Sequence, residues 1–154
     1  MVPMKRVTPT ATNSLYAYCL YFSSGALARK MERLAQKAWK PVGLSPSLAY
    51  ILMLALDCRI TYPSTLVKEL LLSPSTITRM IRKLEARDLV RLDKYEHLNI
   101  VTPTEKAWDL QPRLWECQEV FYQQCLRLLG EDGQKLAAAM NQATDKLTTF
   151  ATEN

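Results

Sequence analysis

The chain has 154 residues, of which 48% are hydrophobic and 23% charged, and this composition excludes a collagen, a coiled-coil rod and a wholly disordered chain. The length is that of one domain and is sufficient to bury a core without disulfides or a metal ion. Charge is distributed unevenly: residues 1–60 carry eight basic and two acidic side chains, residues 61–103 seven and five, and residues 104–154 five and eight, so the last third is excluded as a polyanion-binding region.

The four cysteines and the single histidine, His97, show no metal-ligand spacing. A tetrahedral zinc site needs clustered thiolates or imidazoles, so we expect no metal and no cofactor. Scattered thiols are typical of a reducing compartment. The sequence contains no Ser-His-Asp arrangement, paired carboxylates or glycine-rich phosphate loop, so we do not expect an enzyme.

The N-terminal region imitates a secretory signal, with Lys5 and Arg6 preceding an apolar stretch. Three tyrosines interrupt that stretch, and its helical pattern continues past Ala28. The longest apolar run, residues 48–56, is far shorter than the roughly 20 residues that a membrane span requires. We therefore expect a cytoplasmic protein with no membrane partner.

Residues 1–12 are polar, include two prolines and are expected to be flexible. Residues 13–43 predict an N-terminal helix, because their apolar positions recur at gaps of seven, four, three and four. We expect this helix to begin at Asn13 or Ser14, whose side chains can cap it, and to end near Lys40.

Ser45 followed by Pro46 predicts the start of a second helix, which ends near Cys58. This helix is apolar on nearly every side, as is typical of a helix at the centre of a fold. Ser64 then predicts the cap of a short helix over residues 65–72.

Ser73 is expected to cap the next helix, which ends near Arg87. Two β-like runs follow over residues 89–92 and 98–102, and the polar residues 93–97 between them predict a hairpin with a polar tip.

Thr104 predicts the cap of a long C-terminal helix with Glu105 in its first turn. Gly130 predicts its end, immediately after Leu129. A last helix is predicted over residues 132–150.

The order of these elements predicts a mainly α fold with a small β-hairpin wing, in which residues 44–103 form a winged helix-turn-helix. One face of the helix after Ser73 is apolar, and the opposite face carries hydroxyl and basic side chains. Such a helix fits the DNA major groove, where hydroxyls permit close approach and arginine can bind guanine through two hydrogen bonds. We also expect the first-turn amides of Ser75 and Thr76 to be free to bind a phosphate.

The alternative without a DNA-binding role is a solvent-exposed helix with an ordinary basic face. The predicted DNA-binding residues are Ser73, Ser75, Thr76, Thr78, Arg79, Arg82 and Lys83 of the helix-turn-helix and Arg91, Lys94 and His97 of the wing.

Residues from about 44 to 107 resemble the MarR family of bacterial transcriptional regulators, and the flanking helices extend the resemblance over nearly the whole chain. The resemblance implies dimerisation helices over residues 13–43 and 104–154 that interlock in a homodimer. It also implies binding to a palindromic operator, by a repressor that a small-molecule effector releases. The segments that carry the resemblance are Leu66-Val67-Lys68-Glu69-Leu70, Ser75-Thr76-Ile77-Thr78-Arg79-Met80-Ile81-Arg82-Lys83-Leu84-Glu85, Leu89-Val90 and Thr104-Glu105-Lys106.

The chain departs from the family pattern at three places. Asp88 stands where the family usually has the glycine that ends the recognition helix, and Ala107 stands where a second glycine is common. The wing is short and lacks the family's Asp-x-Arg tip, so Lys94 is expected to contact a phosphate in place of a minor-groove arginine.

Two alternative functions stay open. Cys19 lies among tyrosines near the position from which part of the family senses oxidants, so a thiol-based oxidant sensor of the same fold is one alternative. The short wing motivates the other, a helical protein-interaction module that no longer binds an operator.

The flanking helices are also rich in aromatic residues, which favour either a dimer core or a pocket for a small aromatic effector. These residues are Tyr16, Tyr18, Tyr21, Phe22, Trp39, Tyr50, Trp108, Trp115, Phe121 and Tyr122.

Overall fold

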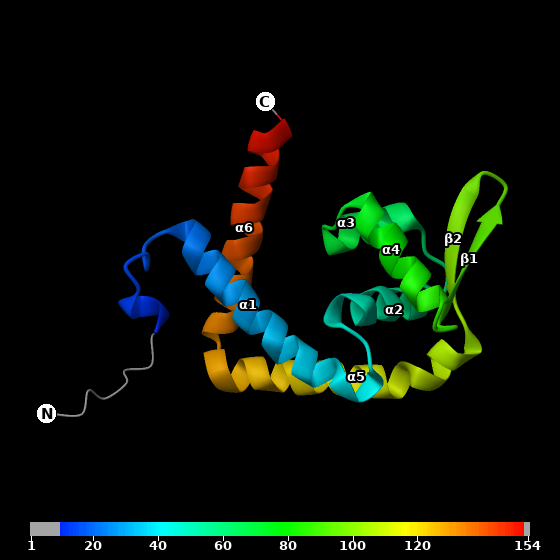
Figure 1. Cartoon of the computed structure of the whole chain (residues 1–154), viewed down its shortest axis with the longest axis horizontal. Coiled ribbons are helices and arrows are strands. Elements are labelled where there is room, and N and C mark those ends of the chain that lie inside the picture. Colours follow the sequence, from blue (N-terminus) through cyan, green and yellow to red (C-terminus); the bar gives the residue numbers. More distant parts are fainter. Residues whose placement is uncertain (1–9, 153–154) are drawn as a thin grey trace, which may run out of the picture.

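The computed structural model of the chain describes residues 10–152 and shows a mainly helical protein with one antiparallel hairpin, which confirms the predicted fold class. Three helices and the hairpin form a lobe at one end of the molecule, while the first and last helices lie at the other end (Figure 1). The fifth helix runs along the base of both ends (Figure 1). In chain order the elements are η1 (Ala11–Asn13), α1 (Leu20–Trp39), η2 (Lys40–Val42), α2 (Pro46–Cys58), α3 (Pro63–Leu70), α4 (Pro74–Glu85), β1 (Val90–Tyr95), β2 (Leu98–Pro103), α5 (Glu105–Leu129) and α6 (Asp132–Thr152), where η denotes a 3-10 helix.

Three predicted helix caps are confirmed by their hydrogen bonds. The Ser45 hydroxyl accepts from the Leu48 amide, the Ser73 hydroxyl from the Thr76 amide and the Thr104 hydroxyl from the Ala107 amide. Each cap satisfies a first-turn amide that the helix itself leaves without a partner. The starts of α2, α4 and α5 therefore follow from short-range sequence signals.

The predicted start of the first helix is wrong. Helix α1 begins at Leu20 with Cys19 as its N-cap, because the preceding residues form η1 and a series of turns. The Ser14 hydroxyl accepts from the Tyr16 amide at 3.1 Å and so serves a local turn instead of capping a helix. Most of the segment predicted to be flexible, residues 1–9, lies outside the described residues.

Helix α3 also starts earlier than predicted, at Pro63. Proline has no amide hydrogen and a helical φ, so it suits the first helical position, and Ser64 does not act as the cap. The helix ends at Leu70, because Leu71 adopts a left-handed conformation with φ +52°.

The hairpin is longer and its tip tighter than predicted. Strand β1 continues to Tyr95, and β2 begins at Leu98, which leaves two residues at the tip instead of five. Asp93 has a low strand propensity, but its pairing with Ile100 keeps it in the ladder. At the tip, Glu96 takes φ +56°.

The core is continuous from the lobe that contains α4 into the middle of α5. Helix α2 supplies its centre, with Ile51 and Leu52 fully buried. Trp39 at the end of α1 is also fully buried and packs against Tyr50 and Phe121, with each pair of ring centroids 5.3 Å apart. The largest fully buried side chains are Trp39, Ile51, Leu52, Leu56, Leu66, Ile77, Ile81, Leu84, Leu114, Val90, Val101 and Thr61.

Within residues 10–152, no single helix combines the length and the apolar character needed to cross a membrane. The segments Leu20–Val42 and Pro46–Cys58 satisfy that test only as a pair and are bent by 60° at the break between them. The same described residues contain no group of three or more His, Cys, Asp and Glu side chains that could hold a metal ion.

We predict that Ile81→Asp unfolds the lobe that contains α4. Ile81 is 1% exposed on the inner face of α4, and an unpaired buried charge costs several kcal/mol, against a total stability of about 5–15 kcal/mol. Thermal unfolding followed by circular dichroism checks this result. The exposed neighbour Lys83→Asp is the matched control and should keep the wild-type melting temperature. An Ile81→Asp protein that melts with the control would mean that α4 packs through another face.

We predict that Asp88→Gly stabilises the protein. Asp88 adopts φ +56°, which costs a residue with a side chain about 1 kcal/mol, whereas glycine tolerates this conformation but loses more backbone entropy on folding. The expected net gain is about 0.5 kcal/mol, which raises the melting temperature by roughly 1–2 °C. Lys83→Gly, inside the regular part of α4, should instead lower it.

Candidate nucleic-acid interface

Helix α4 presents a polar surface because its other side is anchored in the core. Ile77, Ile81 and Leu84 are at most 1% exposed. The opposite side is exposed and forms a shallow hollow that ends at Ala86. We call the five exposed polar residues that line the hollow the recognition face: Ser75, Thr78, Arg79, Arg82 and Lys83.

Ser73 and Thr76, which the sequence placed with the DNA-binding residues, are occupied by the cap of α4. The Ser73 hydroxyl accepts from the Thr76 amide at 3.3 Å and donates to the Thr76 hydroxyl at 2.8 Å. The expectation of a free Thr76 amide is therefore wrong. For the Ser75 amide, the described residues provide no hydrogen-bond partner, so this first-turn donor stays available to an anion.

The hydroxyl of Thr78 already uses its hydrogen in a bond within α4. It donates to the Pro74 carbonyl at 2.9 Å. Its oxygen lone pairs are left as acceptors, which suit the exposed amino group of adenine or cytosine in the major groove. Arg79, the next residue, is exposed beside it.

The positive charge of the recognition face is not neutralised within the described part of the chain. Among residues 10–152 the one ion pair joins Lys135 to Asp132 in α6. Arg79, Arg82 and Lys83 therefore keep their full charge for an external anion.

The structure separates the two basic side chains predicted for the wing. Side chains alternate between the two faces of a strand, so Arg91 and Lys94 lie on opposite faces of the hairpin. Lys94 shares its face with the half-buried Leu92. His97 is exposed at the two-residue tip. Arg91 and Lys94 therefore cannot both face one and the same surface of a ligand.

Glu85, for which the sequence predicted no role of its own, connects the wing to α4. Its carboxylate oxygen accepts from the Leu92 amide of β1 at 3.3 Å. An acidic residue at a helix end has many other uses, so no sequence signal identified this contact. A second unpredicted contact lies nearby, where the Thr104 hydroxyl donates to the Asp88 carbonyl at 2.7 Å.

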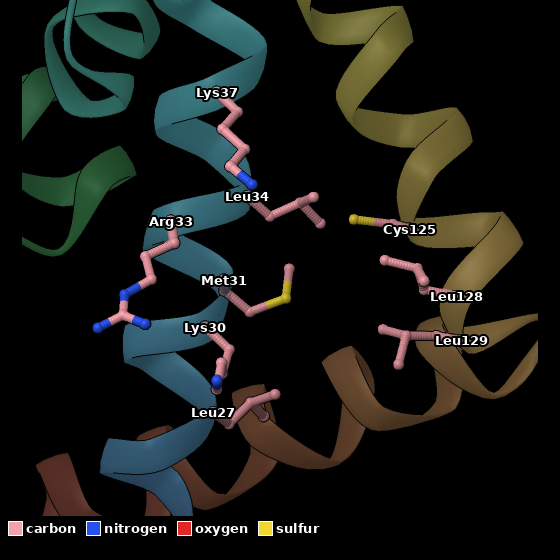
Figure 2. Close-up of a pocket in the computed structure, with 9 residues that line it drawn as sticks. All are labelled: Leu27, Lys30, Met31, Arg33, Leu34, Lys37, Cys125, Leu128 and Leu129. Atoms are coloured by element: carbon pink, nitrogen blue, oxygen red, sulfur yellow. The ribbon is translucent and has the colours of Figure 1, made fainter. Parts of the chain in front are cut away.

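A second surface feature lies between α1 and α5 and shares no lining residue with the recognition face (Figure 2). It is a groove of about 450 Å³, which we call the α1–α5 groove. Figure 2 shows Met31 and Leu34 of α1 pointing toward α5, whereas Arg33 points away. The groove therefore has apolar walls and a basic rim. Its lining residues are Leu27, Lys30, Met31, Arg33, Leu34, Lys37, Cys125, Leu128 and Leu129.

The aromatic residues do not form one cluster. Trp39 belongs to the internal core, whereas Tyr16 stacks on Phe22 at 4.6 Å near the start of α1, where both are exposed. None of the residues that line the α1–α5 groove is aromatic. Within the single chain the aromatics are therefore divided between the internal core and the exposed start of α1, while a dimer core or an effector pocket built from them stays a prediction.

The cysteines of α5 have weakly acidic thiols. Burial raises the pKa of both Cys117 and Cys125, and at Cys117 the nearby Arg113 opposes this effect only in part. Burial therefore disfavours the reactive thiolate form at both residues. Cys19 is half-buried at the N-cap of α1.

No protein-family model and no curated protein sequence matches the chain. Solved structures match it over most of its length. The organohalide-sensing RdhR-CbdbA1625 transcriptional regulator in its 2,4-dichlorophenol-bound form is 16% identical, covers 95% of this chain and 89% of its own, and superposes with a TM-score of 0.73. BpsR of Bordetella bronchiseptica, whose DNA binding is regulated by 6-hydroxynicotinic acid, is 14% identical, with coverage of 85% and 97% and a TM-score of 0.72. A MarR-family regulator from Listeria monocytogenes in complex with a 26mer DNA is 20% identical, with coverage of 83% and 88% and a TM-score of 0.67.

These likenesses agree with the element order, the capped helix α4 and the hairpin described above. At such low identities they concern the fold and leave the individual side chains to be judged from this structure. The chain has the winged-helix fold of the MarR-type transcriptional regulators.

Proposed function

We propose that the protein is a dimeric transcriptional regulator that binds duplex DNA through α4 and the wing. The observation that carries this proposal is the recognition face, where three unpaired cations and two hydroxyls project from a helix fixed in the core. The DNA complexes of the Listeria protein and of a MarR mutant from Escherichia coli support it by analogy of fold.

The residues of the recognition face differ in the DNA groups that they can reach. Thr78 and Arg79 lie on the first turns of α4, the part of a recognition helix that contacts base edges. Arg82 and Lys83 lie one turn later, so we assign them to the phosphate backbone. In the wing, we assign Lys94 to a phosphate, because it is exposed near the tip.

A second copy of the chain is proposed to cover the apolar surface at the other end of the molecule. Helix α6 carries large apolar side chains at Leu136, Met140, Leu147 and Phe150, all on one side and between 38% and 66% exposed. The α1–α5 groove presents further uncovered apolar surface. Two copies related by a twofold axis would bury these surfaces and would match a palindromic operator.

As the last part of the proposal, the protein represses transcription until a small-molecule effector releases it from DNA. This part rests on analogy with RdhR-CbdbA1625 and BpsR, whose structures involve 2,4-dichlorophenol and 6-hydroxynicotinic acid. For an oxidant-sensing regulator, the thiols to test are Cys19, which the sequence singles out, and the exposed Cys58, because burial disfavours the thiolates of Cys117 and Cys125. For a protein-interaction module, duplex binding would be absent.

We predict that Arg79→Ala and Lys83→Ala affect DNA binding in different ways. Loss of Arg79 should cost roughly 1–3 kcal/mol per bidentate contact and relax the preference at one base pair of each half-site. Loss of Lys83 should weaken all duplexes alike and lower the salt slope by about one per lost phosphate contact, doubled in a dimer. Lys94→Ala should behave like Lys83→Ala. Operator and random-duplex affinities measured across a salt series check these expectations.

Lys146→Ala removes an exposed cation from α6 and is the matched control, with no expected effect on either duplex. Equal losses for operator and random DNA in all three test variants would refute direct base contact by α4. Absence of salt-dependent duplex binding in the wild type would refute the proposed function itself and favour the interaction module.

We predict that Leu147→Asp dissociates the dimer. Leu147 is 64% exposed in the single chain, and burial of a leucine stabilises an interface by roughly 1.5–3 kcal/mol per copy. Over the two copies this amounts to roughly 3–6 kcal/mol, so the dissociation constant should rise at least about a hundredfold. Sedimentation at micromolar concentration checks this, and the control is Asn141→Asp, an exposed residue of α6 about 120° around the helix from Leu147. A wild-type monomer would contradict the dimer.

A further inference from the structure

Three basic side chains outside the recognition face donate hydrogen bonds to backbone carbonyls. Arg87 Nη1 donates to the Gly43 oxygen at 2.6 Å, and Arg113 Nη2 donates to the Pro41 oxygen at 2.8 Å. Lys106 Nζ donates to the oxygen of Arg87 itself at 2.8 Å. We call these three contacts the carbonyl clamp.

The carbonyl clamp closes a ring around three elements. Arg87 lies just beyond the C-terminal end of α4, while Lys106 and Arg113 lie two turns apart on α5. Pro41 and Gly43 belong to the connector between α1 and α2. The bonds therefore run from the connector to Arg87, from Arg87 to α5, and from α5 back to the connector.

The connector is suited to hold a fixed position within this ring. It begins at Trp39, which is fully buried against Tyr50 and Phe121. It ends at Gly43, whose φ of +67° is a conformation that side chains disfavour, and the Gly43 amide donates to the Lys40 carbonyl at 3.0 Å. One end of the connector is thus packed in the core, and the two arginines hold its carbonyls from outside.

The clamp holds the end of α4 that is opposite to the end assigned to base contact. Thr78 and Arg79 lie near the N-terminal end of α4, whereas Arg87 follows its C-terminal end. A small rotation about the C-terminal end displaces the N-terminal turns across the DNA groove. In a twofold dimer, the same rotation changes the separation of the two recognition helices.

We propose that Arg87, Lys106 and Arg113 are positioning residues that set the angle of α4 relative to α1 and α5 and thereby determine the spacing between operator half-sites that the dimer accepts. The proposal rests on the proposed function. It makes Arg113, which lines a hollow with Lys37 and Cys117 away from the recognition face, a determinant of DNA preference.

The competing role for exposed basic residues is direct contact with DNA phosphates. Arg87 is exposed and close to α4, so its charge could serve that purpose. A phosphate contact lowers the salt slope of binding to any duplex, whereas a positioning contact changes the preference among duplexes and leaves the slope unchanged. The two roles therefore give different measurements.

The test uses the full chain with Arg87→Gln, Arg113→Gln and the double variant. Arg127→Gln is the matched control, because Arg127 is an exposed arginine of α5 for which the described residues provide no hydrogen-bond partner. The first measurement is amide hydrogen exchange without DNA. Faster exchange is expected at Gly43 and at residues 87–89 in either single variant, with no further increase in the double variant and no change in the control.

The second measurement selects duplexes in which the spacing between two half-sites is varied. The variants should accept a broader or shifted set of spacings, and affinity for the wild-type operator should fall roughly 2- to 30-fold, the range expected for coupling through positioning residues. Random-duplex affinity and its salt slope should stay unchanged.

Unchanged exchange at both sites would overturn the clamp as a restraint. A lower salt slope with an unchanged spacing preference would assign Arg87 to a phosphate and overturn the positioning role. If the wild type binds no duplex, the proposed function and the half-site part of this inference both fail, while the exchange measurement still decides whether the clamp restrains α4.

Discussion

The burial of one side of α4 is the constraint on which the rest of the interface depends. Ile77, Ile81 and Leu84 are withdrawn from water in the core, where α4 packs against α3, β1 and α2, and each contributes roughly 1.5–3 kcal/mol. Because these three positions follow helical spacing, their burial determines the direction of every other side chain of α4. The recognition face is exposed for this reason.

The positive charge that could bind DNA is concentrated at α4. The winged region carries only a small excess of basic residues, yet the basic side chains of α4 have no acidic partner among the described residues. Glu85, the acidic residue of α4, uses its carboxylate to accept from the wing. The charge of Glu85 thus helps to orient the wing. The positive potential at α4 is local, so it does not require the whole domain to be strongly basic.

Helix α5 connects the two ends of the molecule. Its first half is part of the core, with Ala107, Leu114 and Cys117 buried, whereas its last turns line the α1–α5 groove. A helix shared in this way can couple the two ends of the molecule through the contacts that it makes at each of them. The hydrogen bonds of Lys106 and Arg113 are contacts of that kind.

The sequence by itself determined the order of the elements, the caps at Ser45, Ser73 and Thr104, and the inward face of α4. These features depend on residues within about one helical turn of each other, and helical periodicity and capping encode them directly. The same reasoning placed the start of α1 at Asn13 or Ser14, where a local turn formed instead, and made the wing tip too long.

Only the tertiary structure decided which polar side chains act together. It showed that Arg91 and Lys94 lie on opposite faces of the wing, because pairing with β2 extends β1 to Tyr95 and so includes Lys94 in the strand. The bonds from Arg87 to Gly43 and from Arg113 to Pro41 join residues 44 and 72 positions apart. Their acceptors are backbone carbonyls, which every residue has, so no pattern of side chains in the sequence distinguishes them. Such contacts form only when the packed core has placed a particular carbonyl within reach of a particular cation.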